Sequence, residues 1–407
     1  MITLERATET LLDEISPVTR TRLVPLEQAA GRISAQDVRA GIDMPPFDRS
    51  PLDGYALYSG DIAEASREKP VKLKVAAEIA AGSFWDGTLT SGHAARIMTG
   101  SMLPAGADCV VMQEDTDDGE REVEFYAPMK PLKNICFKGE DIKKGTLILP
   151  PGISISCAHL GVLASVGNSR VLVKDRVRAG LLSTGDELTM PGEPLERGRI
   201  YNSNQFMLAG RMEQLGVHVT SLYETGDDAR EVCEIIEREI AGVDIFFTTG
   251  GVSVGRRDIM HSVLERLGAK KLFWKVAIKP GTPVLAAIYR NKLLLCLSGN
   301  PFAAITNFEL LGRPALRKLS GDEKLDLVWI KGVMEDRFSK PSPQRRFVRA
   351  VYEGGRVKIP EYSHSSGALL SLLGSNALID IPEGSRGLEP GDRVDLVMLS
   401  AFAHFTG

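Results

Sequence analysis

Residues 243–255 read VDIFFTTGGVSVG, and this segment decides the fold of the middle of the chain. Val243–Thr248 is a short apolar run of the kind found in strands that are buried on both faces. It meets a glycine-rich loop, Thr249–Gly255, and a helix is predicted from about Asp258 to Leu267. A buried strand that passes through a tight loop into a helix is the repeating unit of a parallel α/β sheet.

The same unit recurs on both sides of this segment. The predicted elements are a strand at Val177–Leu182, a helix at Asn204–Leu215, a strand at Val217–Tyr223, a helix at Ala229–Ile240, strands at Pro283–Tyr289 and Lys292–Leu297 around an Arg290-Asn291 turn, and a helix at Phe302–Leu310. We therefore expect a central, doubly wound parallel α/β domain over residues 176–322, with right-handed crossovers.

The flanking parts of the chain have different patterns. Residues 1–175 open with an amphipathic helix that stops at Pro17 and continue with short β runs broken by glycines. We expect two intertwined subdomains there, one of them a small antiparallel β unit at about 45–140. Residues 323–407 consist of short alternating runs between turns, which predicts a C-terminal β-barrel.

Composition excludes several classes of protein. The chain has 407 residues, of which 43% are hydrophobic and 25% charged, and its formal net charge is −4. These values exclude a disordered protein and argue against a nucleic-acid partner, which needs a basic surface. Met1–Ile15 is too rich in charge for a signal peptide, and no stretch approaches the roughly 18 apolar residues of a membrane span. Five scattered cysteines suit neither a disulfide framework nor a zinc site, and reduced cysteines are typical of the cytoplasm. We therefore expect a cytoplasmic protein, and the lack of a long apolar stretch predicts that it has no membrane partner.

Three loops rich in glycine and hydroxyl side chains follow the predicted strands, at Ser183–Gly185, Thr248–Gly255 and Ser298–Asn300. Ligands of open parallel sheets bind at the carboxyl ends of the strands, where loop glycines and helix N-termini accommodate anions. None of the loops has a dinucleotide fingerprint or a Walker motif. Ordinary turns are the alternative. The candidate ligand-binding residues are Ser183, Gly185, Gly250, Gly251, Ser253, Gly255, Ser298, Gly299 and Asn300.

Carboxylates gather at the same predicted edge, at Asp186, Glu187, Asp227, Asp228 and Asp258. Beside phosphate-binding loops, such oxygen ligands indicate Mg²⁺ as the cofactor. Helix capping is the alternative, and it suits Asp228 better. Lys275 and Lys279 would share one face if they lay in a single strand, where they could hold a multiply charged anion. A solvated strand face is the alternative for this pair.

Seven motifs carry a family resemblance. They are Ser50–Ala56, Arg96–Gly100, Gly139–Ile142, Ser183–Leu188, Thr249–Gly255, Ala277–Gly281 and Gly299–Pro301. In their order and over nearly the whole chain they resemble the MoeA family of molybdopterin molybdenumtransferases and the matching domain of gephyrin. The resemblance implies a homodimer with a split N-terminal region, a molybdopterin-binding α/β domain and a C-terminal β-barrel.

The resemblance also implies a reaction. Adenylylated molybdopterin and molybdate would give molybdenum cofactor and AMP, with Mg²⁺ required. The partners implied are the adenylyltransferase that supplies the substrate and the molybdoenzymes that receive the product. By motif position, the catalytic residues would be Asp53, Thr99, Glu187, Lys275 and Lys279, the metal ligands Glu187, Asp227 and Asp258, and an oxyanion ligand Arg349. The cleft would lie between the α/β domain of one subunit and the β unit of the other.

Three positions depart from the pattern of many family members. Thr282 replaces a lysine, Ser298 replaces a proline, and Ala303 stands where a serine follows the Asn-Pro pair. The lysine and the serine belong to the family's oxyanion site. The departures therefore leave tungstate insertion as an alternative. A molybdopterin adenylyltransferase and a noncatalytic molybdopterin-binding scaffold are two further alternatives.

Overall fold

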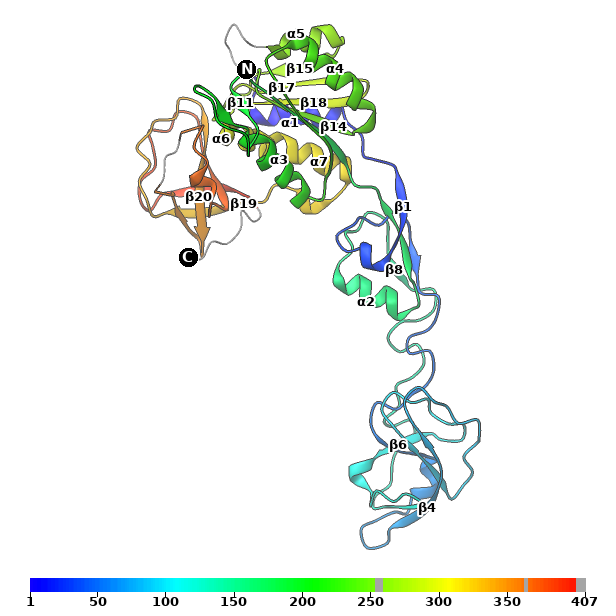
Figure 1. Cartoon of the computed structure of the whole chain (residues 1–407). Helices are drawn as coiled ribbons and strands as arrows, with labels where there is room; N and C mark the ends of the chain where they lie inside the picture. Colours follow the sequence, from blue (N-terminus) through cyan, green and yellow to red (C-terminus); the bar gives the residue numbers. More distant parts are fainter. Residues whose placement is uncertain (253–258, 362–364, 400–407) are drawn as a thin grey trace.

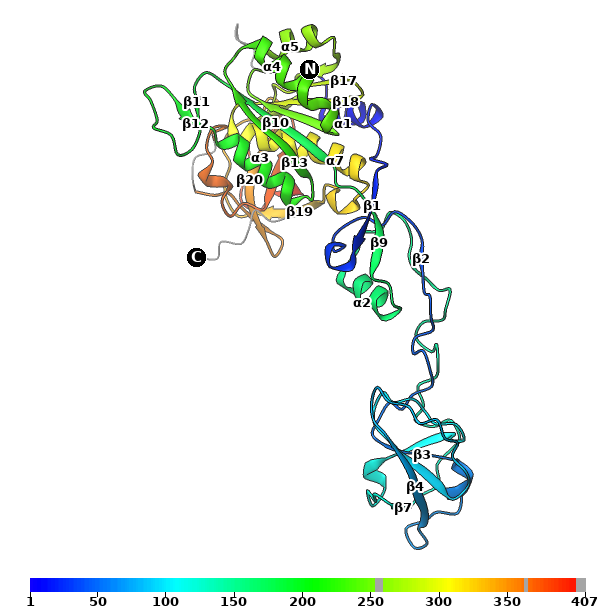
Figure 2. The ribbon, with the colours of Figure 1, turned by 45° about the vertical axis from the view of Figure 1, so that its right-hand side comes forward.

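The computed structural model describes residues 1–252, 259–361 and 365–399. It shows an elongated molecule in which the central domain and the C-terminal domain lie side by side at one end (Figure 1). A narrow arm leads from the central domain to a β unit at the far end, and the view turned by 45° shows the same separation (Figure 2). No helix in the described parts of the chain is long and apolar enough to cross a membrane.

The central sheet has the strand order β13-β10-β14-β18-β17-β15. Its parallel strands are β10 (Arg178–Thr184), β13 (His218–Thr225), β14 (Ile245–Thr249) and β18 (Lys292–Leu297). The expectation of a wholly parallel sheet was wrong for β17 (Leu285–Tyr289), which is antiparallel to both β18 and β15 (Lys270–Trp274). The cause is the two-residue turn Arg290-Asn291, whose φ angles of 47° and 60° suit a tight hairpin.

Helices cover both faces of this sheet, as a doubly wound fold requires. One face carries α1 (Leu4–Asp13), α3 (Ser203–Gln214), α6 (Pro301–Asn307) and α7 (Arg313–Ser320), and the other carries α4 (Ala229–Glu239) and α5 (Ile259–Leu267). Leu4, Ala7 and Leu11 of α1 are buried in the same core as Phe247 of β14. The first helix of the chain thus packs on the central domain.

The N-terminal region is split, as expected. The proximal subdomain joins segments from both sides of the distal unit and packs them around one core. Its elements are β1 (Thr21–Pro25), β2 (Val38–Arg39), β8 (Leu147–Leu149), α2 (Cys157–Ser165) and β9 (Arg170–Lys174). The β1–β9 pair forms a ribbon that leads into the central domain (Figure 2).

The distal β unit has the strand order β6-β3-β5-β4-β7. Its strands are β3 (Gly54–Leu57), β4 (Val71–Ile79), β5 (His93–Ile97), β6 (Cys109–Met112) and β7 (Glu122–Phe125). The expected antiparallel arrangement is wrong for one pair, because β4 and β5 run parallel. The chain between them crosses over instead of turning back as a hairpin.

The C-terminal domain is the predicted β-barrel. Its strands pair in the closed ring β20-β21-β19-β23-β22, since β20 also pairs with β22. The strands are β19 (Trp329–Met334), β20 (Arg345–Glu353), β21 (Arg356–Lys358), β22 (Ala377–Ile381) and β23 (Arg393–Met398). A short strand, β16 (Ile278–Lys279), joins β20 and ties the barrel to the central domain.

Candidate active site

A cleft of about 560 Å³ lies at the carboxyl edge of the central sheet. Its walls are the loops after β10, β14 and β18, the first residues of α3 and α6, and a segment of the C-terminal domain that includes Gly367 and Leu369. The parallel strands end at one edge, so the three predicted loops come together there. The cleft therefore lies where the sequence places the ligand site.

Gly250 lies where these loops pack closely. Gly250 has a φ of +91°, and a Cβ atom there would lie 2.2 Å from the carbonyl oxygen of Thr184. A Cβ atom at Gly299 would lie 3.5 Å from the Cα of Gly250. The loops after β10, β14 and β18 are thus in direct backbone contact, and only glycine fits at position 250.

Most of the predicted ligand-binding loop residues line this cleft. Gly185, Gly250, Gly251, Ser298, Gly299 and Asn300 all do. Ser183 does not, because its hydroxyl is buried and accepts a hydrogen bond from the Thr249 hydroxyl at 3.1 Å, and the neighbouring Thr184 lines the cleft instead. Ser253 and Gly255 lie outside the described residues.

Two of the predicted carboxylates, Glu187 and Asp227, line the cleft. The Glu187 carboxylate folds over Gly185, where a Cβ atom would lie 2.8 Å from Oε2. Asp186 accepts a hydrogen bond from the backbone N–H of Asp227 at 3.0 Å and so orients the second acidic loop. Asp228 accepts a hydrogen bond from the Arg230 N–H and caps α4. Helix capping is the role that the sequence favoured for Asp228 over metal binding. Asp258 lies outside the described residues.

The predicted lysine pair is not on one strand face. Lys275 follows β15 with a φ of +68°, and its ammonium lies 3.8 Å from the centre of the Trp274 ring. Lys279 belongs to β16, which pairs with the barrel strand β20. The spacing argument was wrong because two separate elements, rather than one strand, carry the two lysines. Neither lysine lines the cleft.

Arg349 lies behind the cleft wall and does not line the cleft. Its guanidinium donates hydrogen bonds to the carbonyl oxygens of Ser365 at 2.9 Å and Ala368 at 2.5 Å, and it stacks 3.8 Å from the centre of the Phe302 ring. Burial lowers the pKa of Arg349 to about 10. In this conformation Arg349 fastens the segment that contains Gly367 to the start of α6.

Asp53 and Thr99 form a pair at the other end of the molecule. The backbone N–H and the hydroxyl of Thr99 both donate to Asp53 Oδ1 at 2.7 Å. The Thr99 N–H, followed by its hydroxyl, lowers the pKa of Asp53 below its ordinary value. Asp53 directly precedes β3 and Thr99 follows the paired strand β5, so the pair belongs to the distal β unit, which lies far from the central domain (Figure 1).

Sequence reasoning missed the residues at the N-terminus of α3. Asn202 caps the helix by accepting from the Gln205 N–H, and Asn204 donates to the carbonyl oxygen of Gly299 at 2.7 Å. The side-chain oxygen of Asn204, Oδ1, is buried and makes no hydrogen bond among the described residues. An asparagine just before an amphipathic helix, as at Asn202, is an N-cap signal and could have been noticed.

The three departures occupy different environments. The Thr282 hydroxyl donates to the Ile278 carbonyl oxygen at 2.5 Å, so its proton is already engaged. Ser298 is buried and lines the cleft. Ala303 is buried in α6 and does not line it.

Comparison with known proteins agrees with this architecture. Residues 2–167 match the model of the MoeA N-terminal region, residues 180–318 that of the probable molybdopterin-binding domain, and residues 331–399 that of the MoeA C-terminal region. Two curated relatives are the molybdopterin molybdenumtransferases of Staphylococcus epidermidis and Staphylococcus aureus. Each is 36% identical, over 92% and 93% of this chain and 90% and 91% of the relative, respectively.

A solved structure is similar over the whole length. The molybdopterin biosynthesis MoeA protein of Pyrococcus horikoshii has a TM-score of 0.85 and 31% identity, and the match covers 99% of this chain and 100% of that one. The order of domains, the split N-terminal region and the closed C-terminal barrel are those of one known family. The chain therefore belongs to the MoeA family of molybdopterin molybdenumtransferases, enzymes of molybdenum cofactor biosynthesis.

Proposed function

We propose that this enzyme transfers molybdenum from molybdate to adenylylated molybdopterin and releases AMP in an Mg²⁺-dependent reaction. The observation that carries the proposal is the composition of the cleft. It combines glycine loops in backbone contact with two carboxylates, Glu187 and Asp227, at one edge of the sheet. Glycine loops and helix N-termini suit a phosphoanhydride, and carboxylates beside phosphates suit a divalent cation.

The cleft also offers a way to orient the pterin. The N-terminus of α3 opens into it, and its positive dipole end favours the anionic part of the substrate. Asn204 Oδ1 is a buried acceptor without a hydrogen bond among the described residues, and a pterin N–H could donate to it. Asn204 would then hold the substrate with its oxygen and the third loop with its amide nitrogen.

The cleft residues suit an Mg²⁺ ion whose coordination is completed by substrate phosphates and water. The described residues contain no cluster of three or more acidic, histidine or cysteine side chains that could hold a metal by themselves. Mg²⁺ is usually held by one or two carboxylates together with substrate phosphates and water, which is what Glu187 and Asp227 could provide. We keep Asp258 as a third candidate ligand. When bound, the cation would neutralise charge on the phosphates as the anhydride bond breaks.

A homodimer would complete the site. Asp53 and Thr99 are held rigidly by two short hydrogen bonds, yet they lie far from the cleft of their own chain (Figure 1). We propose that a second subunit brings its distal β unit to the cleft, so that this pair faces the reacting groups. Lys275 and Lys279 would then bind the anionic substrates from the central domain.

Molybdate is the oxyanion that we assign. Its negative charge calls for cations and fixed donors, and we propose Lys275 and Lys279 for that role. Arg349 would act by positioning the segment around Gly367, since its donors are engaged by carbonyl oxygens. The enzyme would work in the cytoplasm, between an adenylyltransferase that supplies the substrate and the molybdoenzymes that receive the cofactor.

The test is molybdate-dependent AMP release from adenylylated molybdopterin, with Mg²⁺ present or removed by chelation. Glu187→Gln and Asp227→Asn should each lower the rate by about 10²-fold or more, the usual effect of lost electrostatic stabilisation. Asp228→Asn is the matched control, because asparagine also caps helices and Asp228 does not line the cleft. Wild-type rates in both cleft variants would refute the assignment of the carboxylates.

A further inference from the structure

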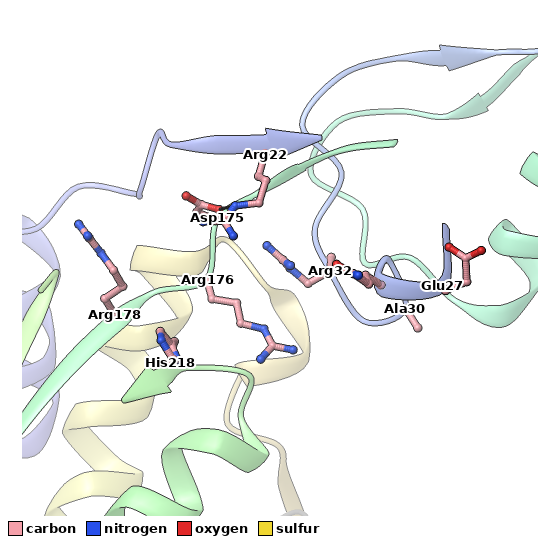
Figure 3. A pocket seen from close by; sticks show the side chains of 9 residues that line it. Arg22, Glu27, Ala30, Arg32, Asp175, Arg176, Arg178 and His218 are labelled. Atoms are coloured by element: carbon pink, nitrogen blue, oxygen red, sulfur yellow. Dashed lines mark ion pairs between the residues drawn. The ribbon is translucent and has the colours of Figure 1, made fainter. Parts of the chain in front are cut away.

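A second hollow, of about 520 Å³, lies at the joint between the central domain and the proximal subdomain (Figure 3). Arg178 at the start of β10 and His218 at the start of β13 line it on one side. It therefore lies at the amino edge of the central sheet, whereas the cleft lies at the carboxyl edge. The proposed reaction uses none of its residues.

The lining of this hollow is strongly basic. Four arginines line it, against two carboxylates. With His218 neutral, this leaves a formal excess of two positive charges in a chain whose net charge is −4. The lining charges are Arg22, Arg32, Arg176 and Arg178, with Glu27 and Asp175.

The carboxylates neutralise only part of this charge. Arg22 Nε lies 3.2 Å from Asp175, and Arg178 Nε lies 3.9 Å from the buried Asp244. Arg32 donates to the carbonyl oxygen of Lys174 at 2.9 Å.

Within residues 1–252, 259–361 and 365–399, neither Arg32 nor Arg176 has a carboxylate within 4.0 Å. Burial, and then the charge of Arg176, lower the pKa of Arg32, so the two guanidinium groups repel each other.

The two guanidinium groups that lack a carboxylate partner enter the hollow from different elements. Figure 3 shows Arg32 reaching in from the proximal subdomain and Arg176 from the segment that joins β9 to β10. Arg32 is half-buried and Arg176 is exposed. Like charges that lie near one another repel, and a bound anion relieves that repulsion. Guanidinium groups bind phosphate oxygens in a bidentate manner, which lysines cannot do.

We propose that this hollow binds the diphosphate group of a small molecule. Its volume exceeds that of a single tetrahedral oxyanion, and arginines enter from two sides, so that each phosphate of a diphosphate could meet one guanidinium group. The site would also bridge the joint, because Arg32 belongs to the proximal subdomain and Arg178 to the central domain. Binding would favour one angle of the arm that carries the distal β unit.

The experiment is titration calorimetry of the full chain with inorganic pyrophosphate, with sulfate at equal ionic strength as the ion control. Arg32→Gln and Arg176→Gln should each weaken pyrophosphate binding by at least about tenfold, as expected for the loss of one charge-assisted contact. The matched control is Arg386→Gln, which removes the same charge from an exposed position of the C-terminal domain and should leave the affinity unchanged. Melting temperatures without ligand show whether each variant is folded.

Hydrogen exchange separates this site from the cleft. Pyrophosphate should slow exchange in β1, β9 and the start of β10 even in a Glu187→Gln chain, so the outcome does not depend on the reaction proposed for the cleft. Protection confined to the glycine loops of the cleft would overturn the proposal. Equal pyrophosphate affinity in Arg176→Gln and Arg386→Gln would also overturn it. So would an Arg32→Gln or Arg176→Gln variant that changes subunit association but not pyrophosphate affinity.

Discussion

Gly250 shows how one residue determines the geometry of the cleft. It follows β14 with a φ of +91°, and the Thr184 carbonyl oxygen occupies the place of a Cβ atom. Glycine is needed for two reasons. Other residues rarely adopt a φ in this range, and a Cβ atom on any of them would clash with the Thr184 carbonyl oxygen. The contact brings the loops after β10 and β14 together.

Gly250→Ala should therefore damage both the fold and the binding of molybdopterin. Backbone strain alone should lower the free energy of unfolding by about 1–3 kcal/mol, and displacement of the Thr184 loop should weaken binding further. Gly242→Ala is the control, since Gly242 is exposed and a Cβ atom there meets nothing within 4 Å. Urea denaturation and molybdopterin titration measure the two effects. Similar results for both variants would show that the loop contact is unimportant.

Thr282 is the departure with a measurable consequence. Its hydroxyl proton is engaged by the Ile278 carbonyl oxygen, so it offers an oxyanion neither a charge nor a free donor. Thr282→Lys should tighten molybdate binding by about tenfold, which corresponds to about 1.4 kcal/mol, near the lower end for a charged hydrogen bond. Separate titrations with molybdate and tungstate would measure this. Unchanged affinity for both would mean that position 282 does not face the oxyanion.

The positions of single residues were predictable where they follow from a place after a strand. Glu187, Asp227 and four of the glycines line the cleft because each follows a parallel strand; these glycines are Gly185, Gly250, Gly251 and Gly299. Lys275 and Lys279 were misplaced, since nothing in their spacing reveals that the chain leaves β15 and enters another sheet. Arg211, Glu309 and Arg313 form a fully buried ion network, although charged residues in a helical pattern predict a solvated face.

Among the elements, the β1–β9 ribbon controls how the arm joins the central domain. Arg20, just before β1, donates two hydrogen bonds to Asp244 at 2.9 and 2.7 Å, and Asp244 also accepts from the backbone N–H of Arg178. Burial by itself would raise the pKa of Asp244, but these hydrogen bonds outweigh it and lower the pKa below its ordinary value. One buried carboxylate thus fastens the ribbon to the sheet.

Asp244→Asn should loosen this joint. The variant should lose about 2 kcal/mol of unfolding free energy at pH 7, within the range of charged hydrogen bonds. Because the folded-state pKa is lowered, the wild-type advantage is complete well above pH 3.8 and shrinks as the pH falls below that value. Asp326→Asn, in an exposed pair with Arg317, should cost less than about 1 kcal/mol. Urea denaturation at pH 7 and below pH 3.8 measures the two free energies of unfolding. An equal difference between wild type and Asp244→Asn at both pH values would contradict the prediction.

Elements were predictable where one pattern dominates. The strand Lys292–Leu297 has the expected bounds because it is an apolar run that begins directly after a turn. The reversal of β17 follows from the Arg290-Asn291 turn, which the sequence shows, although the parallel expectation did not use it. The strand Lys270–Trp274 was missed, since two lysines at its start hide the apolar pattern.

At the scale of the whole molecule, the shape separates residues that the family resemblance places in one site. The distal unit that holds Asp53 and Thr99 lies at the opposite end from the cleft (Figure 1). Local pattern cannot predict this, because a long-range separation leaves no periodic signal in one chain. The proposed dimer would resolve the separation if each subunit brought its distal unit to the cleft of the other.

The most direct test is complementation between two inactive chains. Asp53→Asn and Glu187→Gln would be co-expressed with different tags, and the heterodimer would be purified and assayed for molybdate-dependent AMP release. Each homodimer should be slower than wild type by about 10²-fold or more. The heterodimer contains one site with both residues intact, so it should recover about half of the wild-type rate per dimer. A heterodimer as inactive as the two homodimers, or a fully active monomer, would contradict the shared site.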